Sequence, residues 1–197
     1  MGNMEKLIEL IAAHEGMIRT SQVEAAGIPR KYLSLLTQMG KLERLSQGIY
    51  LSPNAFEDRL YRLQLRCTVG VYSHETALFL HGLSDREPQT SMMTVPNGYN
   101  AHHLAMESIK IFYIRKELHE LGKTTAQTSF GRTVNCYDQE RTLCDMIRSR
   151  SQMDPALLNA AFKTYIRQKG KNIPLLIDYS AQLGILNLMR NYLEVLL

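Results

Sequence analysis

The sequence predicts a mixed α+β fold, in which an N-terminal winged helix-turn-helix is followed by a larger mixed α/β C-terminal domain. Two observations support this prediction. Residues 1–53 contain three short helix-like segments and then two short alternating segments, which is the order of elements in a winged helix. In residues 71–197, a first helix-like segment is followed by strand-like segments and then by further helix-like ones. Residues 54–70 are expected to connect the two domains, with a helix over 58–66.

The first two helices are predicted from apolar spacing and from capping residues. A helix over 4–14 follows from an apolar stripe at helical spacing. The stripe consists of Met4, Leu7, Ile8 and Ile11. The second helix begins near Thr20 or Ser21, because either hydroxyl can serve as its cap and Ser21 has capping-box spacing to Glu24. Gly27 is expected to end it.

The third helix and a hairpin complete the predicted winged helix. Pro29 is expected to open the helix, because the first helical turn has no use for the N–H that proline lacks. The helix runs to about Met39. Alternating segments over 42–45 and 48–51 then predict a hairpin with its turn at 46–48. The expected core consists of Leu7, Ile11, Val23, Leu33, Leu36, Leu42 and Ile49.

The C-terminal domain is predicted to be richer in helix. Its expected strands are 92–95, 109–114, 124–129 and 133–137, the last two forming a hairpin. Its expected helices are 73–81, 138–149, 155–168, 174–183 and 185–195. Ser73 and Asp138 are expected to cap the helices that they begin, and Pro155 to open another. Arg141 and Asp145, four residues apart on one helix, are expected to pair.

Polar residues of the winged helix form a candidate DNA-binding surface. The first turn of a recognition helix faces base edges in the major groove, where Arg and Lys donate to guanine and Gln pairs with adenine. The candidates on this helix are Arg30, Lys31, Tyr32, Ser34 and Gln38. Candidates for phosphate or minor-groove contact are Thr20, Ser21, Gln22, Lys41, Arg44 and Gln47. Each basic residue taken singly is compatible with a solvated surface, but their convergence on one face favours DNA binding.

The charge distribution indicates a second basic region. The net charge of +4 and the pI of about 9.0 mildly favour a polyanionic partner. Residues 155–177 carry basic side chains and no acidic ones. This region predicts either a solvated charge run or a surface for RNA, a nucleotide or DNA phosphate. Its residues are Lys163, Arg167, Lys169 and Lys171, with Arg148 and Arg150 as an extension.

Other residue types give no sign of catalysis, a metal or a cofactor. The cysteines, at 67, 136 and 144, form no CxxC pair and are expected to be reduced, partly buried thiols. The histidines match no zinc spacing, and the acids at 138 and 140 suit a helix start. No apolar run approaches the roughly 20 residues that cross a bilayer, and the first residues lack a signal-peptide layout. We therefore expect a cytoplasmic protein that is no enzyme and has no membrane partner.

Several segments resemble a known family. The segments GIPRKYL (27–33), GKLERL (40–45) and GIYLSP (48–53) resemble the N-terminal domain of AbiEi-type antitoxins, from the type IV toxin–antitoxin systems of abortive phage infection. The segments SHETAL (73–78), HGL (81–83) and DQERTLCD (138–145) are similar to the C-terminal antitoxin domain of that family. Leu35 departs from the pattern, since many relatives have a basic residue there.

The resemblance implies two activities. The N-terminal domain would bind inverted repeats in the promoter of its own operon and repress it. The C-terminal domain would neutralise a nucleotidyltransferase-like toxin without a stable complex. If that toxin acts on nucleotides or RNA, the second basic region is the expected antitoxin surface. One winged helix buries little DNA surface, so two or more protomers are expected on the DNA.

Two alternatives remain open at this stage. In the first alternative, the protein is a winged-helix regulator whose C-terminal domain senses a small molecule. A toxin-like gene next to its own gene would argue against this alternative. In the second alternative, the protein is an enzyme, such as a nuclease that the winged helix brings to DNA. The lack of a metal or nucleophile constellation argues against an enzyme.

Overall fold

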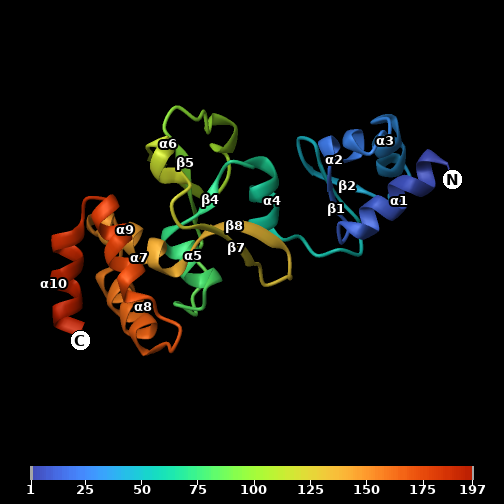
Figure 1. The fold of residues 1–197 in the computed structure, drawn as a ribbon. Coiled ribbons are helices and arrows are strands. Elements are labelled where there is room, and N and C mark those ends of the chain that lie inside the picture. Colours follow the sequence, from blue (N-terminus) through green and yellow to red (C-terminus); the bar gives the residue numbers. More distant parts are fainter. Residues whose placement is uncertain (1, 197) are drawn as a thin grey trace. The chain divides into compact units, whose positions relative to one another are not determined.

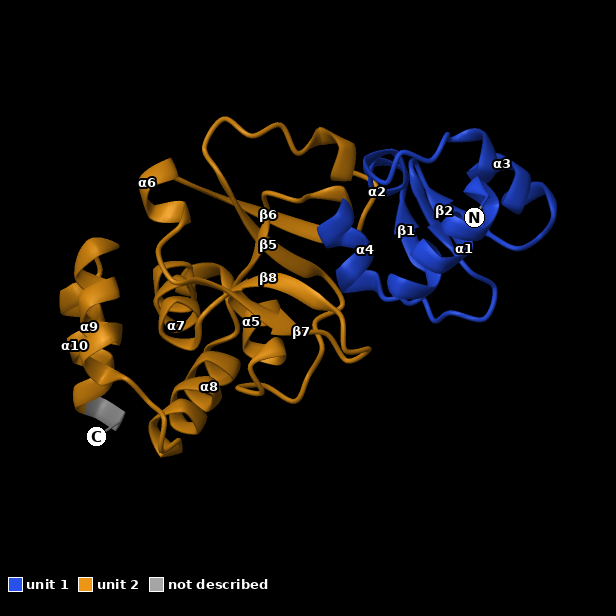
Figure 2. Ribbon diagram, turned by 45° about the vertical axis from the view of Figure 1, so that its right-hand side comes forward, with its two compact units in different colours: residues 1–65 blue, residues 66–197 orange. Residues whose placement is uncertain are grey.

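The computed structural model describes residues 2–196, except for the side chains of 195 and 196, and divides the chain into two compact units. Unit 1 ends at Leu65 and unit 2 begins at Arg66 (Figure 2). This boundary falls inside the segment 54–70 that the sequence predicts to connect the two domains. Each unit has a hydrophobic cluster of its own.

Unit 1 is a winged helix (Figure 1). Its helices are α1 (Asn3–Ala13), α2 (Thr20–Ala25) and α3 (Lys31–Gln38), and α4 (Arg59–Arg66) crosses the unit boundary. Its strands are β1 (Met17–Arg19), β2 (Glu43–Ser46) and β3 (Ile49–Leu51). They form an antiparallel three-stranded sheet in the order β1-β3-β2. The predicted three helices and hairpin are confirmed.

Strand β1 is absent from the sequence prediction. It pairs with β3 so that Met17 faces Leu51 and Arg19 faces Ile49. Met17 and Ile18 are consecutive and both fully buried, so the strand lacks the alternation that identifies a half-buried strand. Its partner lies far along the chain, and the pairing therefore comes from tertiary structure rather than from a local pattern.

The start of α2 differs from the prediction. Neither Ser21 nor Thr20 caps the helix: the N–H of Arg19 donates to Gln22 Oε1 at 2.7 Å, which places the capping interaction one or two residues earlier. The Thr20 hydroxyl instead donates to the carbonyl of Gly48 at 3.3 Å. Thr20 is thereby used to hold the hairpin turn against the helix.

The start of α3 also differs from the prediction. Pro29 does not begin the helix, which starts at Lys31 with Arg30 as the residue before it. The N–H groups of Tyr32 and Leu33 donate to the carbonyls of Pro29 and Arg30, which is the i to i+3 pattern of a tight turn. Pro29 therefore fixes the turn that precedes the helix rather than its first helical position.

The core of unit 1 matches the expected residues closely. The main cluster includes Leu7, Ile11, Val23, Leu33, Leu36 and Leu42, together with Ile18 and Ile28. Ile49 is buried as predicted, but it lies in a second cluster with Met17 and Leu51. The second cluster exists because β1 pairs with β3, which the sequence pattern does not reveal.

Unit 2 contains a five-stranded sheet in the order β6-β5-β4-β8-β7. Its strands are β4 (Val71–Tyr72), β5 (Ser91–Pro96), β6 (Ile109–Ile114), β7 (Lys123–Gln127) and β8 (Thr133–Tyr137). The pairs β5–β6 and β4–β8 are parallel, whereas β4–β5 and β7–β8 are antiparallel. The four predicted strands are confirmed. The short central strand β4, which joins the two halves of the sheet, is not predicted.

Helices make up the rest of unit 2. They are α5 (His74–Leu80), α6 (Lys116–His119), α7 (Gln139–Arg148), α8 (Pro155–Arg167), α9 (Ile173–Gln182) and α10 (Leu186–Leu196), with short 3-10 turns η1 (His102–Leu104) and η2 (Arg150–Gln152). Helices α7 to α10 gather together beside the sheet (Figure 1). Their shared core centres on the wholly buried Leu143, Phe162 and Met189. The mixed α/β class of the C-terminal domain is therefore confirmed.

The predicted helix starts in unit 2 are mostly confirmed. The Asp138 carboxylate accepts a hydrogen bond from the N–H of Arg141 at 2.8 Å, and Pro155 opens α8. Ser73 holds the capping position of α5, but its side chain makes no capping hydrogen bond. The Ser73 hydroxyl lies instead 2.9 Å from His74 Nδ1 and accepts from Thr94 Oγ1 at 2.8 Å.

Candidate nucleic-acid interface

A polar groove of about 530 Å³ lies between α2, α3 and the β2–β3 hairpin of unit 1. Six predicted DNA-binding residues meet in it: Thr20, Ser21, Arg30, Ser34, Arg44 and Gln47. Arg30, the residue just before α3, and Ser34 lie one helical turn apart on the exposed side, whereas Leu36 points into the core. The groove is thus formed by the helix-turn-helix together with the wing.

The other predicted residues lie outside this groove. Gln22 accepts the capping hydrogen bond from Arg19, and Lys31 lies with Nζ 5.4 Å from the centre of the Tyr32 ring. Gln38 is exposed at the end of α3. Lys41 lines a different hollow of about 300 Å³, together with apolar residues of α1. The structure therefore separates Lys41 from Arg44 and Gln47.

Three groove residues with polar side chains are missing from the predicted DNA-binding set: Arg19, Glu24 and Tyr50. Arg19 ends β1, so it could be placed only once that strand is known. Tyr50 lies on β3 opposite Arg44 of β2. Glu24 is singled out in the sequence only as a capping residue, and no local pattern links it to α3.

The groove is strongly basic. Its charged side chains are three arginines, Arg19, Arg30 and Arg44, and a single acid, Glu24. Glu24 forms an ion pair with Arg30 across the turn between α2 and α3. Hydrogen bonding from Arg30 lowers the pKa of Glu24, and the same bond raises the pKa of Arg30. One arginine of the groove is therefore already paired, which leaves an excess of positive charge.

The hairpin turn is fixed to the start of α2. The N–H of Thr20 donates to the carbonyl of Gly48 at 2.8 Å, and the Thr20 hydroxyl contacts the same oxygen. Gly48 has a φ of +73°, a conformation that glycine adopts without strain. This contact holds the neighbouring Gln47 and Arg44 on the same groove as the α2 N-terminus.

The second predicted basic region divides into two places in unit 2. Lys163 and Arg167 are exposed on α8, and Lys169 and Lys171 are exposed just after it. Arg148, at the end of α7, lines a small hollow that none of these four residues lines. Arg150 lies in η2, where its Nη1 donates to the carbonyl of Ile147 at 3.4 Å.

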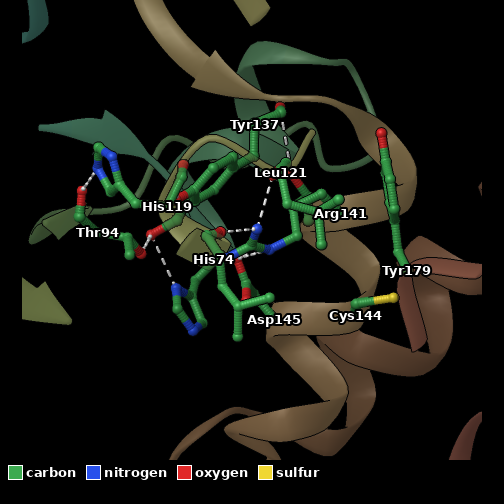
Figure 3. A network of polar contacts seen from close by, with 12 residues as sticks. His74, Thr94, His119, Leu121, Tyr137, Arg141, Cys144, Asp145 and Tyr179 are labelled. Atoms are coloured by element: carbon green, nitrogen blue, oxygen red, sulfur yellow. Dashed lines mark hydrogen bonds and ion pairs between the residues drawn. The ribbon is translucent and has the colours of Figure 1, made fainter. Parts of the chain in front are cut away.

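Unit 2 also buries a polar network around Arg141 (Figure 3). The Arg141 side chain is fully buried, and its Nη1 donates to the carbonyls of Leu118 and Leu121 at 2.8 and 2.6 Å. The guanidinium carbon lies 4.1 Å from the centre of the Tyr137 ring. The predicted Arg141–Asp145 pair is confirmed, with Nε 3.1 Å from Oδ2. Arg141 thus connects α7 to the segment around α6.

The remaining sequence-based interpretations concern thiols, metals and membranes. The three cysteines are buried thiols, and burial raises the pKa of the Cys67 thiol. Within residues 2–196, no three His, Cys, Asp or Glu side chains are grouped so that they could hold a metal ion. Across the same residues, no helix combines the length and the apolar character needed to cross a membrane.

The segment that contains this groove matches a known protein family. Residues 5–53 match the family described as "Transcriptional regulator, AbiEi antitoxin". The AbiEi match runs from α1 to just after β3 and so contains every residue of the groove. The resemblance that the N-terminal segments indicate is therefore confirmed. No curated protein matches the chain.

A solved structure resembles a larger part of the chain. The RV2827C protein from Mycobacterium tuberculosis matches with a TM-score of 0.60 and 13% sequence identity. The match covers 91% of this chain and 71% of the mycobacterial chain. At this level of identity the likeness shows a shared fold. That fold extends well beyond the AbiEi segment and into unit 2.

Proposed function

We propose that the protein is a cytoplasmic DNA-binding regulator that represses its own operon, and that it also acts as an antitoxin. The observation that supports DNA binding is the groove of unit 1, where Arg19, Arg30 and Arg44 converge on the recognition-helix side of a winged helix. The AbiEi match over the same residues supports the regulatory role.

The groove residues divide naturally between bases and phosphates. Arg30 and Ser34 lie along the exposed side of α3, the helix that enters the major groove in this motif. Arg44 and Gln47 belong to the wing, and wing side chains typically contact the backbone or minor groove. We propose that α3 reads base edges while Arg19 and Arg44 bind phosphates, which makes affinity strongly dependent on salt.

The proposed operator is an inverted repeat in the promoter of the same operon. One winged helix presents only a single groove, and specific DNA-binding modules of this size usually act in pairs. We therefore propose that two or more protomers bind together, one on each half-site.

A titration tests the DNA-binding proposal with two matched variants. The DNA upstream of the gene is titrated with wild type, Arg44→Gln and Lys41→Gln over a series of salt concentrations. Both variants lose one positive charge from neighbouring positions, but only Arg44 lines the groove. We expect Arg44→Gln to weaken specific binding by at least about tenfold and Lys41→Gln by less than about threefold. The proposal fails if wild type does not prefer this DNA over random DNA.

The proposed antitoxin activity belongs to unit 2. We propose that it neutralises a nucleotidyltransferase-like toxin without a stable complex and without enzymatic catalysis of its own. The AbiEi match supports an antitoxin role, and Lys163 and Arg167 offer an exposed basic surface on α8. Co-expression with the toxin should restore growth, while the two proteins should elute separately from a size-exclusion column. Loss of rescue in a Lys163→Gln/Arg167→Gln variant would assign the activity to α8.

A ligand-sensing regulator remains the second candidate, because unit 2 contains a cleft of about 480 Å³. Met92, Leu157 and Ala160 give the cleft apolar walls, and Glu75 and Arg86 add opposite charges. Such a cleft has the size of a small-molecule site. Ala160→Trp would fill it. If the protein is a sensor, repression of a promoter reporter should change with growth conditions in wild type but not in this variant.

A further inference from the structure

A small hollow in unit 2 combines several features of a ligand site. It is lined by His74 of α5, Phe112 and Tyr113 of β6, and Asp145, Arg148 and Ser149 at the end of α7. We call it the His74 hollow. Its enclosed volume is about 30 Å³, which is the space of one water molecule or one ligand oxygen. Any larger ligand must therefore insert a single atom and rest its remainder at the mouth.

His74 is held in an unfavourable backbone conformation. Its φ is +52°, in the left-handed region that a residue other than glycine rarely adopts. The surroundings hold it there: Nδ1 lies 2.9 Å from Ser73 Oγ and Nε2 lies 3.0 Å from Ser149 Oγ. The ring stacks on Phe112, with 3.7 Å between centroids. Residues kept in such conformations are concentrated at binding sites and active sites.

The His74 ring is neutral at physiological pH. Burial lowers its pKa to about 4, and the nearby Asp145 carboxylate offsets this only in part. Because hydroxyl groups engage both ring nitrogens, the ring serves to orient Ser149 rather than to carry charge. The Ser149 hydroxyl is half-buried at the wall of the hollow, where it can also donate to a ligand.

The charge around the hollow is positive. Asp145 is neutralised by its ion pair with the buried Arg141. Arg148 is exposed at the mouth, and Lys110 lies with Nζ 5.0 Å from the centre of the Phe112 ring. Neither Arg148 nor Lys110 has an ion-pair partner among residues 2–196. Arg148 and Lys110 are therefore two cations near the hollow that have no anionic partner in the described part of the chain.

The Arg141 guanidinium provides an independent observation. Its Nη2 is buried and has no hydrogen-bond partner in the described part of the chain. A buried guanidinium N–H without a partner is costly, so such an atom usually faces water or a ligand oxygen. The same guanidinium pairs through Nε with Asp145, which lines the hollow (Figure 3).

We propose that the His74 hollow binds a phosphoryl group, with one oxygen inside the hollow near Ser149 and the others at the mouth near Arg148. Two unpaired cations match the charge of a phosphate better than that of a single carboxylate, and arginine binds phosphate oxygens in a bidentate manner. Tyr113 is 48% exposed at the rim, where its ring can stack on a base next to the phosphate. The ligand class is therefore a nucleotide or a nucleotide unit of RNA.

This proposal goes beyond the proposed function and does not depend on it. The groove of unit 1 also attracts phosphates, so its contribution must be removed in any test. Arg44→Gln reduces that contribution without touching the hollow, because Arg44 belongs to unit 1. Arg150 is the matched control for Arg148, since both are exposed arginines two residues apart and only Arg148 lines the hollow.

Calorimetric titration of the full chain in the Arg44→Gln background provides the test. The probes are inorganic phosphate, adenosine 5′-monophosphate and a short single-stranded RNA. We expect at least one probe to bind, Arg148→Gln to weaken its binding by about tenfold or more, and Arg150→Gln to change it by less than about twofold. If the ligand is a free nucleotide, adenosine monophosphate should bind more tightly than the RNA, and its affinity should depend only weakly on salt. If the ligand is RNA, the RNA should bind more tightly, and its affinity should fall steeply with salt.

Two results would overturn the proposal. One is the absence of binding by all three probes at millimolar concentration. The other is an equal loss of affinity in Arg148→Gln and Arg150→Gln, which would indicate diffuse surface charge rather than a site. Ser149→Ala offers a second check that leaves the charge unchanged, and it should also weaken binding if a ligand oxygen meets the Ser149 hydroxyl.

Discussion

Arg141 and Asp145 form a buried ion pair: their side chains are 0% and 4% exposed, and Arg141 Nε lies 3.1 Å from Asp145 Oδ2. The same guanidinium donates to two backbone carbonyls and covers the Tyr137 ring. Such a pair adds little net stability compared with an apolar replacement, but losing one partner leaves a buried charge uncompensated. Both residues are therefore expected to be sensitive to substitution one at a time.

Asp145→Asn should destabilise the protein by about 3–5 kcal/mol, because it leaves the Arg141 guanidinium buried without a counter-charge. Urea denaturation followed by circular dichroism measures the change. Asp154→Asn is the matched control, since Asp154 caps α8 from an exposed position and asparagine caps a helix about as well. A loss in Asp145→Asn no larger than in Asp154→Asn would contradict the prediction.

Gly122→Ala should be severely destabilising. Gly122 has a φ of +72°, and a Cβ there would lie 2.6 Å from Cβ of Arg141. Gly131 is a matched control, with a φ of +78° and nothing within 4 Å of an added Cβ. Because backbone strain is common to both, Gly122→Ala should cost about 2 kcal/mol more than Gly131→Ala through the clash alone. Equal losses of unfolding free energy in the two variants would show that α7, which carries Arg141, shifts away from the added Cβ at little cost.

The sequence predicts those parts of the fold that depend on local pattern. Helices α1 and α7 have apolar stripes and capping residues within a few positions, so their ranges are close to the predicted ones. Strands β1 and β4 are two or three residues long and gain their pairing from distant strands. No local periodicity marks such strands, because their burial is decided by tertiary contacts.

The same reasoning explains which site residues could be predicted. Arg30 and Ser34 share a helix face, so their spacing is sufficient to place them together. Glu24 meets Arg30 only because a turn folds α2 against α3. In the His74 hollow, His74, Phe112 and Ser149 come from three elements that are far apart in the chain. Histidine spacing alone favours a structural role and gives no sign of this site.

Glu24→Gln should tighten DNA binding several-fold. In the free protein the Glu24 carboxylate holds Arg30, and the base edges of the DNA must compete with it. The substitution frees Arg30 and also removes the acid of the groove, so the net positive charge facing the phosphates rises by one and the slope of log K against log salt should become steeper by up to about 0.9. Glu43→Gln is the control, because Glu43 is exposed on β2 and does not line the groove. The two variants would bind alike if the Glu24–Arg30 pair had no role.

Stability should fall in acid because of His74. Burial lowers its folded-state pKa to about 4, whereas an unfolded histidine titrates near 6.5, so between these values only the unfolded chain binds the proton. Stability is therefore present above pH 6.5 and is lost as the pH falls toward 4, by about 2 kcal/mol between pH 7 and pH 5.

His74→Asn isolates this effect from the titration of other groups. Asparagine tolerates the positive φ of His74 and can hydrogen bond to the same hydroxyls, but it does not titrate. The difference in unfolding free energy between wild type and His74→Asn, measured by urea denaturation at each pH, should shrink as the pH is lowered from 7 to 5. A difference that stays constant over this range would mean that His74 is protonated in the folded protein as readily as in the unfolded chain, and that its ring is open to water.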